Sequence, residues 1–173
     1  MQTNLNDFIS RMIDFNITKV GLNRIFPVGL PSLDQSSNWN SIIPELNNTL
    51  ITGASGLLGS NLVRHYASIS NCTGWYSSNQ ISIDGAILDR VDLTDHRAVE
   101  TALQRTQPDL IIHCAAASDV DWCEQHPDQA KAINVDATKF MVEQSIKHGS
   151  KFIFVSSPFI FDGIAGHYRE SDL

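Results

Sequence analysis

The chain has 173 residues, of which 42% are hydrophobic and 18% charged, and it carries a formal net charge of -7. This length and apolar content predict a globular domain with a buried core, and the acidic balance argues against nucleic acid or an anionic membrane as partner, since both need clustered Lys and Arg. No Cys-x-x-Cys pair, signal peptide or apolar run of roughly 20 residues is present, so we expect a cytoplasmic protein with no membrane span and no disulfide framework.

Residues 1–47 are expected to form an N-terminal extension. Apolar side chains between Leu5 and Ile13 recur at helical spacing and predict a short amphipathic helix. A polar stretch, residues 31–47, then reads as a linker. Nothing in this segment identifies a function, and one hypothesis is that it is the tail of an upstream domain in a fusion protein.

From residue 48 onward, short apolar runs alternate with helical patterns, which is typical of a parallel sheet with crossover helices. The sequence predicts a doubly wound α/β sheet, a Rossmann fold of strand order 3-2-1-4-5, over residues 48–173. The expected strands are 49–52, 72–76, 86–91, 109–115 and 151–156. The expected helices are 57–68, one that Asp95 caps and that ends before Pro108, and 128–148 with Gly149 after it.

A glycine-rich bend follows the first strand. Gly53, Gly56 and Gly59 form Gly-x-x-Gly-x-x-Gly, with Ser55, Leu57 and Leu58 between them. Glycines permit a tight turn and a close backbone approach, and the free N–H groups of the next helix favour an anion. We therefore predict a cradle for the pyrophosphate of a dinucleotide, against the alternative of a flexible loop.

Two further groups of residues extend this prediction along the same edge of the sheet. Ser77 and Ser78 follow the second strand where an acidic residue would select NAD, so NADP is favoured and NAD stays open. Asp92, at the end of the third strand, is expected to accept a hydrogen bond from the adenine amine, although capping of the next helix is an alternative. Small residues after the fourth strand would let a dinucleotide cross the edge, close packing being the alternative: Ala115, Ala116, Ala117 and Ser118.

We predict no metal site. Cys123-x-x-His126 supplies too few ligands for tetrahedral zinc, and Cys114 is expected on a buried strand.

These motifs together resemble the extended short-chain dehydrogenase/reductase family, within it the dTDP-4-dehydrorhamnose reductase group and the related regulatory beta subunit of methionine adenosyltransferase. The resemblance rests on the order and spacing of several matching pieces: the glycine bend, Asp92-Leu93-Thr94-Asp95, His113-Cys114-Ala115-Ala116, Val120-Asp121, Asn134-Val135, Ser156-Ser157, Phe161-Asp162-Gly163 and Tyr168-Arg169-Glu170. It implies an NAD(P)-dependent reductase of a nucleotide-linked 4-keto sugar. It also implies that Leu93 and Asn134 lie at the cofactor.

The resemblance assigns Ser157 to the catalytic position that hydrogen-bonds the reacting oxygen. A Tyr-x-x-x-Lys pair supplies the proton in that family, and the sequence has none after Ser157. Because that pair and the C-terminal substrate lobe are missing, we expect the chain to bind cofactor but not to turn over by itself.

Pro158-Phe159 replaces the usual Asp-Tyr, which leaves the sugar undetermined. The alternative function is a non-catalytic NADP-binding regulatory module that docks a partner. Whether the chain forms a homodimer is left open.

Overall fold

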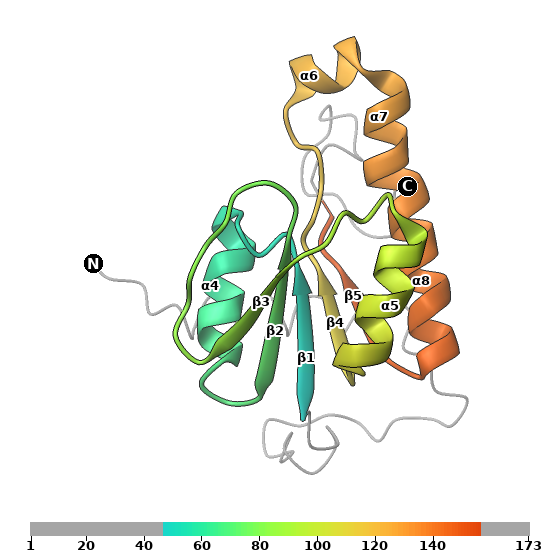
Figure 1. Ribbon diagram of the computed structural model, residues 1–173. Coiled ribbons are helices and arrows are strands. Elements are labelled where there is room, and N and C mark those ends of the chain that lie inside the picture. The colour runs from blue at the N-terminus through green and yellow to red at the C-terminus, as the bar shows by residue number, and fades with distance from the viewer. Residues whose placement is uncertain (1–46, 157–173) are drawn as a thin grey trace, which may run out of the picture. The chain divides into compact units, whose positions relative to one another are not determined.

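The computed structural model describes residues 47–156, which contain a sheet of five parallel strands in the order β3-β2-β1-β4-β5 (Figure 1). The strands are β1 Asn48–Thr52, β2 Asn71–Tyr76, β3 Ala86–Arg90, β4 Leu110–His113 and β5 Lys151–Phe154. The predicted doubly wound Rossmann order is confirmed.

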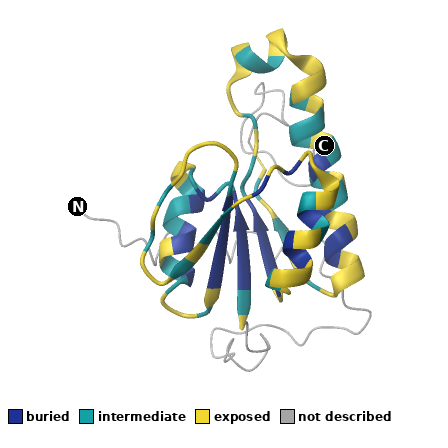
Figure 2. Ribbon diagram, in the orientation of Figure 1, coloured by how far each residue is buried: buried dark blue, intermediate teal, exposed yellow. Residues whose placement is uncertain are grey.

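The central strand β1 and its neighbour β4 are deeply buried (Figure 2). Leu50 and Ile51 of β1 are both 0% exposed although they point to opposite faces, and every residue of β4 is buried. A strand that is apolar on both faces must be covered on both, which is why its run is continuous rather than alternating. The register aligns Thr52 of β1 with His113 of β4 and with Trp75 of β2, so β1 and β4 end together and β2 ends one residue later.

Helices cover both faces of this sheet, with α4 on one side and α5 and α8 on the other (Figure 1). Val99 and Leu103 of α5 and Met141 of α8 share one buried cluster with Leu50 and Ile111 of the sheet. The helices are α4 Leu57–Tyr66, α5 His96–Thr106, α6 Val120–Gln125, α7 Pro127–Lys131, the π-helical turn η1 Ala132–Asp136, and α8 Ala137–His148.

Two of the predicted helix ends are confirmed by their caps. The carboxylate of Asp95 accepts hydrogen bonds from the backbone N–H groups of Arg97 and Ala98, which starts α5. Gly149 follows α8 with φ of 72°, the left-handed conformation in which glycine ends helices.

The region after β4 differs from the prediction. β4 ends at His113 rather than at Ala115, because the N–H of Ala115 turns to the Thr52 hydroxyl instead of continuing a strand ladder. A short helix, α6, was not predicted, and the predicted helix 128–148 is α7 and α8 joined by the π-helical turn. The other elements differ from the prediction at their ends by up to two residues, as helix and strand boundaries commonly do.

The expected helix at Leu5–Ile13, most of the linker at 31–47, and Ser157 lie outside the described residues. Between residues 47 and 156, no helix combines the length and apolar character that crossing a membrane requires.

Candidate functional site

The glycine bend joins β1 to α4 and touches the end of β4. Gly53 has φ of 69°, and a Cβ added to it would lie 2.8 Å from the backbone nitrogen of Ala115. A Cβ on Gly59 would lie 2.1 Å from the carbonyl oxygen of Gly53. Both positions exclude any side chain, so the first turn of α4 packs directly on the bend, and the bend packs directly on the segment after β4.

No side chain caps the N-terminus of α4. Gly56 is the N-cap with extended backbone (φ -79°, ψ 168°). No acidic residue lies in the first turn, and Leu57 is 88% exposed. The first N–H groups of a helix have no partner within it, so these amides present uncompensated partial positive charge at the carboxyl edge of the sheet. This is the arrangement that binds phosphate groups.

The predicted ribose contacts, Ser77 and Ser78, are exposed immediately after β2. Beside them lies a residue that the sequence reasoning missed. Arg90, the last residue of β3, is aligned with Tyr76, and its Nε donates a hydrogen bond to the Ser77 carbonyl oxygen at 2.8 Å. The signal that could have found it is a cation at the end of the third strand, because the ends of neighbouring parallel strands meet at one edge.

Asp92 is exposed at this edge, and its side chain hydrogen-bonds to Thr94, two residues further along the chain. Its Oδ1 accepts hydrogen bonds from the backbone N–H of Thr94 at 2.9 Å and from the Thr94 hydroxyl at 2.7 Å. The bond from the Thr94 hydroxyl, and then that from its backbone N–H, lower the pKa of the Asp92 carboxyl. The positive charge of Arg90 nearby lowers it further. Leu93 is buried in the core, so its side chain is not available to a ligand.

The small-residue segment after β4 is fixed by Asn134 in the π-helical turn. The N–H of Ala117 donates to Asn134 Oδ1 at 2.8 Å, and Asn134 Nδ2 donates to the Ala117 carbonyl oxygen at 3.0 Å. The amide of Asn134 thus forms a two-point clamp on the backbone of Ala117. Asn134 was expected to contact the cofactor, and in the structure its side chain holds the backbone of Ala117.

A buried histidine connects this clamp to the bend. His113 is 0% exposed, with Nδ1 at 2.9 Å from the Thr52 hydroxyl and Nε2 at 3.1 Å from the Thr138 hydroxyl. The Thr138 hydroxyl donates to the Asn134 carbonyl oxygen, and the Thr52 hydroxyl accepts from the N–H of Ala115. Because the Thr138 hydroxyl donates to Asn134, it accepts from Nε2–H, and the neutral ring satisfies the remaining contact when Nδ1 accepts from the Thr52 hydroxyl. Burial lowers the pKa of His113 from 6.5 to about 4, so the ring is neutral near pH 7.

Among residues 47–156, no group of three or more His, Cys, Asp or Glu side chains is placed to hold a metal ion. Burial also raises the pKa of the Cys114 thiol to about 11, which keeps it protonated and unsuited to bind a metal.

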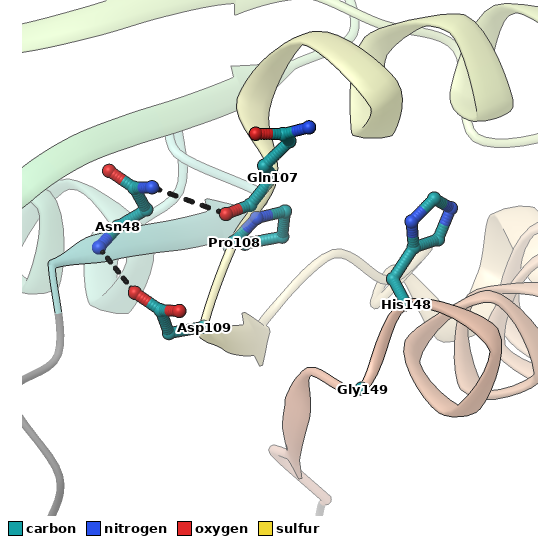
Figure 3. A pocket seen from close by; sticks show the side chains of 6 residues that line it. All are labelled: Asn48, Gln107, Pro108, Asp109, His148 and Gly149. Carbon is teal, nitrogen blue, oxygen red and sulfur yellow. Dashed lines mark hydrogen bonds between the residues drawn. The ribbon is translucent and has the colours of Figure 1, made fainter.

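Two surface hollows lie toward the opposite end of the sheet from the bend. One, of about 360 Å³, is lined by residues from the starts of β1 and β4 and the end of α8 (Figure 3). There Asp109 Oδ2 accepts a hydrogen bond from the Asn48 N–H at 2.9 Å, and Asn48 Nδ2 donates to the Gln107 carbonyl oxygen at 3.3 Å. The other is lined by Arg64, Ser82, Ile83 and Asp84. In doubly wound sheets ligands bind at the carboxyl ends of the strands, so neither hollow is the candidate site.

The glycine bend after β1 lies against the segment after β4. The chain leaves these two neighbouring strands in opposite directions. The connection from β1 leads to β2, and the connection from β4 leads to β5 on the other side. This is the topological switch point of a doubly wound sheet. Fold and site together define a protein of the Rossmann type.

Residues 47–173 match the model of the family described as RmlD substrate binding domain, and the chain belongs to that family. It is similar to methionine adenosyltransferase 2 subunit beta from Bos taurus, at 34% identity over 72% of this chain and 36% of the relative. It is similar to a probable low-salt glycan biosynthesis reductase, Agl14, from Haloferax volcanii, at 38% identity over 70% of this chain and 41% of the relative.

Among solved structures, it is similar to a hypothetical dTDP-4-dehydrorhamnose reductase from Sulfolobus tokodaii, with 36% identity and a TM-score of 0.67. That match covers 73% of this chain and 45% of the other. The chain thus spans less than half the length of these relatives. The expected resemblance to the dTDP-4-dehydrorhamnose reductase group and the methionine adenosyltransferase subunit is confirmed.

Proposed function

We propose that the chain is the dinucleotide-binding part of an NAD(P)-dependent reductase that acts on a nucleotide-linked 4-keto sugar. In this assignment the bend from Gly53 to Gly59 holds the pyrophosphate. Asp92 accepts from the adenine amine through Oδ2, the oxygen that Thr94 leaves free. The small residues from Ala115 to Ser118 form the floor on which the nicotinamide half lies.

The observation that carries this proposal is the backbone cradle. Gly53 and Gly59 pack too closely against backbone to carry a Cβ, which keeps the bend tight, and no side chain caps the start of α4. The bound cofactor would supply the hydride. The chain's own residues bind its phosphates, orient it across the sheet edge and keep Ala117 in place through Asn134.

The test is a calorimetric titration of the full chain with NADPH and with NADH, for the wild type and for Gly56→Ser. The N-cap backbone of Gly56 is already suited to serine, and a Cβ there would meet its nearest neighbour, the Gly53 carbonyl oxygen, at 3.3 Å. The serine hydroxyl would accept from the amides of the first turn, which stabilises α4 by a few tenths of a kcal/mol, and would compete with phosphate for them. We expect a folded variant with at least tenfold weaker dinucleotide binding.

Ser68→Ala is the matched control, because Ser68 follows the other end of α4 and donates only to the His65 carbonyl oxygen. It should bind as the wild type does. A folded wild type that binds neither dinucleotide, or a Gly56→Ser variant that binds both unchanged, refutes the proposal.

The alternative is a regulatory module, favoured by the 34% identity to a subunit of methionine adenosyltransferase 2. Such a module would bind the dinucleotide but work by docking a protein partner. The discriminating observation is the sequence that follows residue 173 in the parent gene. An intact Tyr-x-x-x-Lys pair favours the reductase, and its loss favours the module.

The remaining assignments rest on the same resemblance. Ser157 is proposed to hydrogen-bond the reacting oxygen, and residues 48–173 to form the cofactor domain after an N-terminal extension. The cytoplasm is the proposed compartment, since Cys72, Cys114 and Cys123 are free thiols. A homodimer stays a prediction.

A further inference from the structure

The ribose end of the site contains no acidic residue that would select NAD. In Rossmann proteins a carboxylate at the end of the second strand binds the 2′-hydroxyl of NAD and repels the 2′-phosphate of NADP. Here β2 ends at Tyr76, and Ser77, Ser78 and Asn79 follow. The discrimination between the two dinucleotides must therefore come from another element.

Arg90 is placed on that spot from the neighbouring strand. The register aligns it with Tyr76, and the 2.8 Å hydrogen bond from Nε to the Ser77 carbonyl oxygen holds the guanidinium beside the Ser77-Ser78 segment. A guanidinium has five N–H donors in a rigid plane, so this bond leaves the four on its two terminal nitrogens. That fork matches the oxygens of a phosphate monoester.

The charges around Arg90 favour an anion there. Arg90 makes no ion pair with any residue between 47 and 156, whereas Asp89 on the same strand is already paired with Arg105 at 2.7 Å. Asp92 is close enough to Arg90 for the two charges to interact, and its Oδ1 is held by Thr94. The edge at Ser77 thus carries a positive group whose donors are anchored in position but not neutralised by a direct partner in the described part of the chain.

We propose that Arg90, together with the Ser77 and Ser78 hydroxyls, binds the 2′-phosphate of NADP and so selects NADP over NAD. This inference rests on the proposed dinucleotide site and adds the residue that sets its specificity. The cation comes from β3 and reaches across to the loop after β2.

The experiment measures dissociation constants for NADPH and NADH with the full chain as wild type, Arg90→Ala and Arg90→Lys. The wild type should bind NADPH more tightly than NADH. Loss of a charge-assisted fork should weaken NADPH binding by about 10- to 100-fold in Arg90→Ala and leave NADH within about twofold. Arg90→Lys should recover only part of the loss, because an ammonium keeps the charge without the fork.

Arg105→Ala is the matched control for the loss of one exposed positive charge, since Arg105 pairs with Asp89 instead of facing Ser77. It should leave the preference for NADPH unchanged. Equal affinity of the wild type for both dinucleotides overturns the inference, and so does a loss in Arg105→Ala as large as that in Arg90→Ala. A change in Arg90→Ala that affects NADH as much as NADPH also overturns it.

Those three results would leave the proposed dinucleotide site standing. Failure of the folded wild type to bind either dinucleotide would instead remove the proposed function, and the inference with it.

Discussion

Acidification should destabilise this domain through His113. The ring is 0% exposed and its pKa is lowered from 6.5 to about 4 by burial, whereas in the unfolded chain it titrates near its ordinary value. Above pH 6.5 both states are neutral and the histidine adds no pH dependence. As the pH falls from 6.5 toward 4, the unfolded state takes up the proton first, so the free energy of unfolding decreases.

The magnitude follows from the size of that shift. Each pH unit between the two values costs about 1.4 kcal/mol, so the total approaches about 3 kcal/mol near pH 4. This is a large part of the stability of a small domain. The structural reason is that the ring is fully buried, so water cannot solvate the charge that a second proton would bring.

Urea unfolding at pH values from 7.5 to 4.5, followed by tryptophan fluorescence, measures the effect because Trp75 is buried in the sheet. His113→Gln supplies the comparison, since it removes the titrating ring but keeps one acceptor and one donor. The variant should be less stable at pH 7.5, yet its stability should fall less on acidification. Carboxylates titrate in both proteins and cancel in the difference. Parallel pH curves for the two proteins would refute the assigned neutral histidine.

Two further substitutions test the packing of the site. Gly59→Ala should lower the free energy of unfolding by about 1–2 kcal/mol, because a Cβ placed 2.1 Å from the Gly53 carbonyl oxygen forces backbone apart and outweighs the gain in helix propensity. Urea unfolding checks it, and an unchanged midpoint would contradict the contact. Asn134→Ala should cost about 1–3 kcal/mol and speed hydrogen exchange at the Ala117 amide, since both bonds to that residue are lost. Asn134→Asp keeps the acceptor and should protect this amide partly; equal exchange in all three proteins would contradict the clamp.

The sheet could be predicted from the sequence because its signals are local. The run at Leu110–Ile112 is apolar on both faces, as a central parallel strand requires, and the order of the five strands follows from the family pattern. The glycine bend and the Asp95 cap were found for the same reason, since each is a spacing of a few residues.

The features that were missed depend on contacts between distant residues. Asn134 reaches Ala117 across 17 positions, and the resulting clamp coincides with a π-helical turn that no local pattern indicates. Arg90 meets Ser77 only because β2 and β3 are neighbours in register. Helix α6 is the exception: the Asp119 carboxylate caps it by accepting from the Trp122 N–H at 2.9 Å, and Pro127 begins α7 directly after it, so both local signals were present in the sequence.

The N-cap position in the bend does not hold the residue type that local helix stability favours. Serine, threonine, aspartate or asparagine at an N-cap stabilises a helix, and the backbone of Gly56 already has the dihedral angles that such a cap uses. The chain instead has glycine there, with neither a capping side chain nor an acidic residue in the first turn. Sterics explain Gly53 and Gly59, which a Cβ could not occupy, but Gly56 is exposed and has its nearest neighbour at 3.3 Å. Packing at Gly56 is therefore less restrictive than at Gly53 and Gly59, and the proposed approach of a phosphate to the free amides gives a further reason for glycine there.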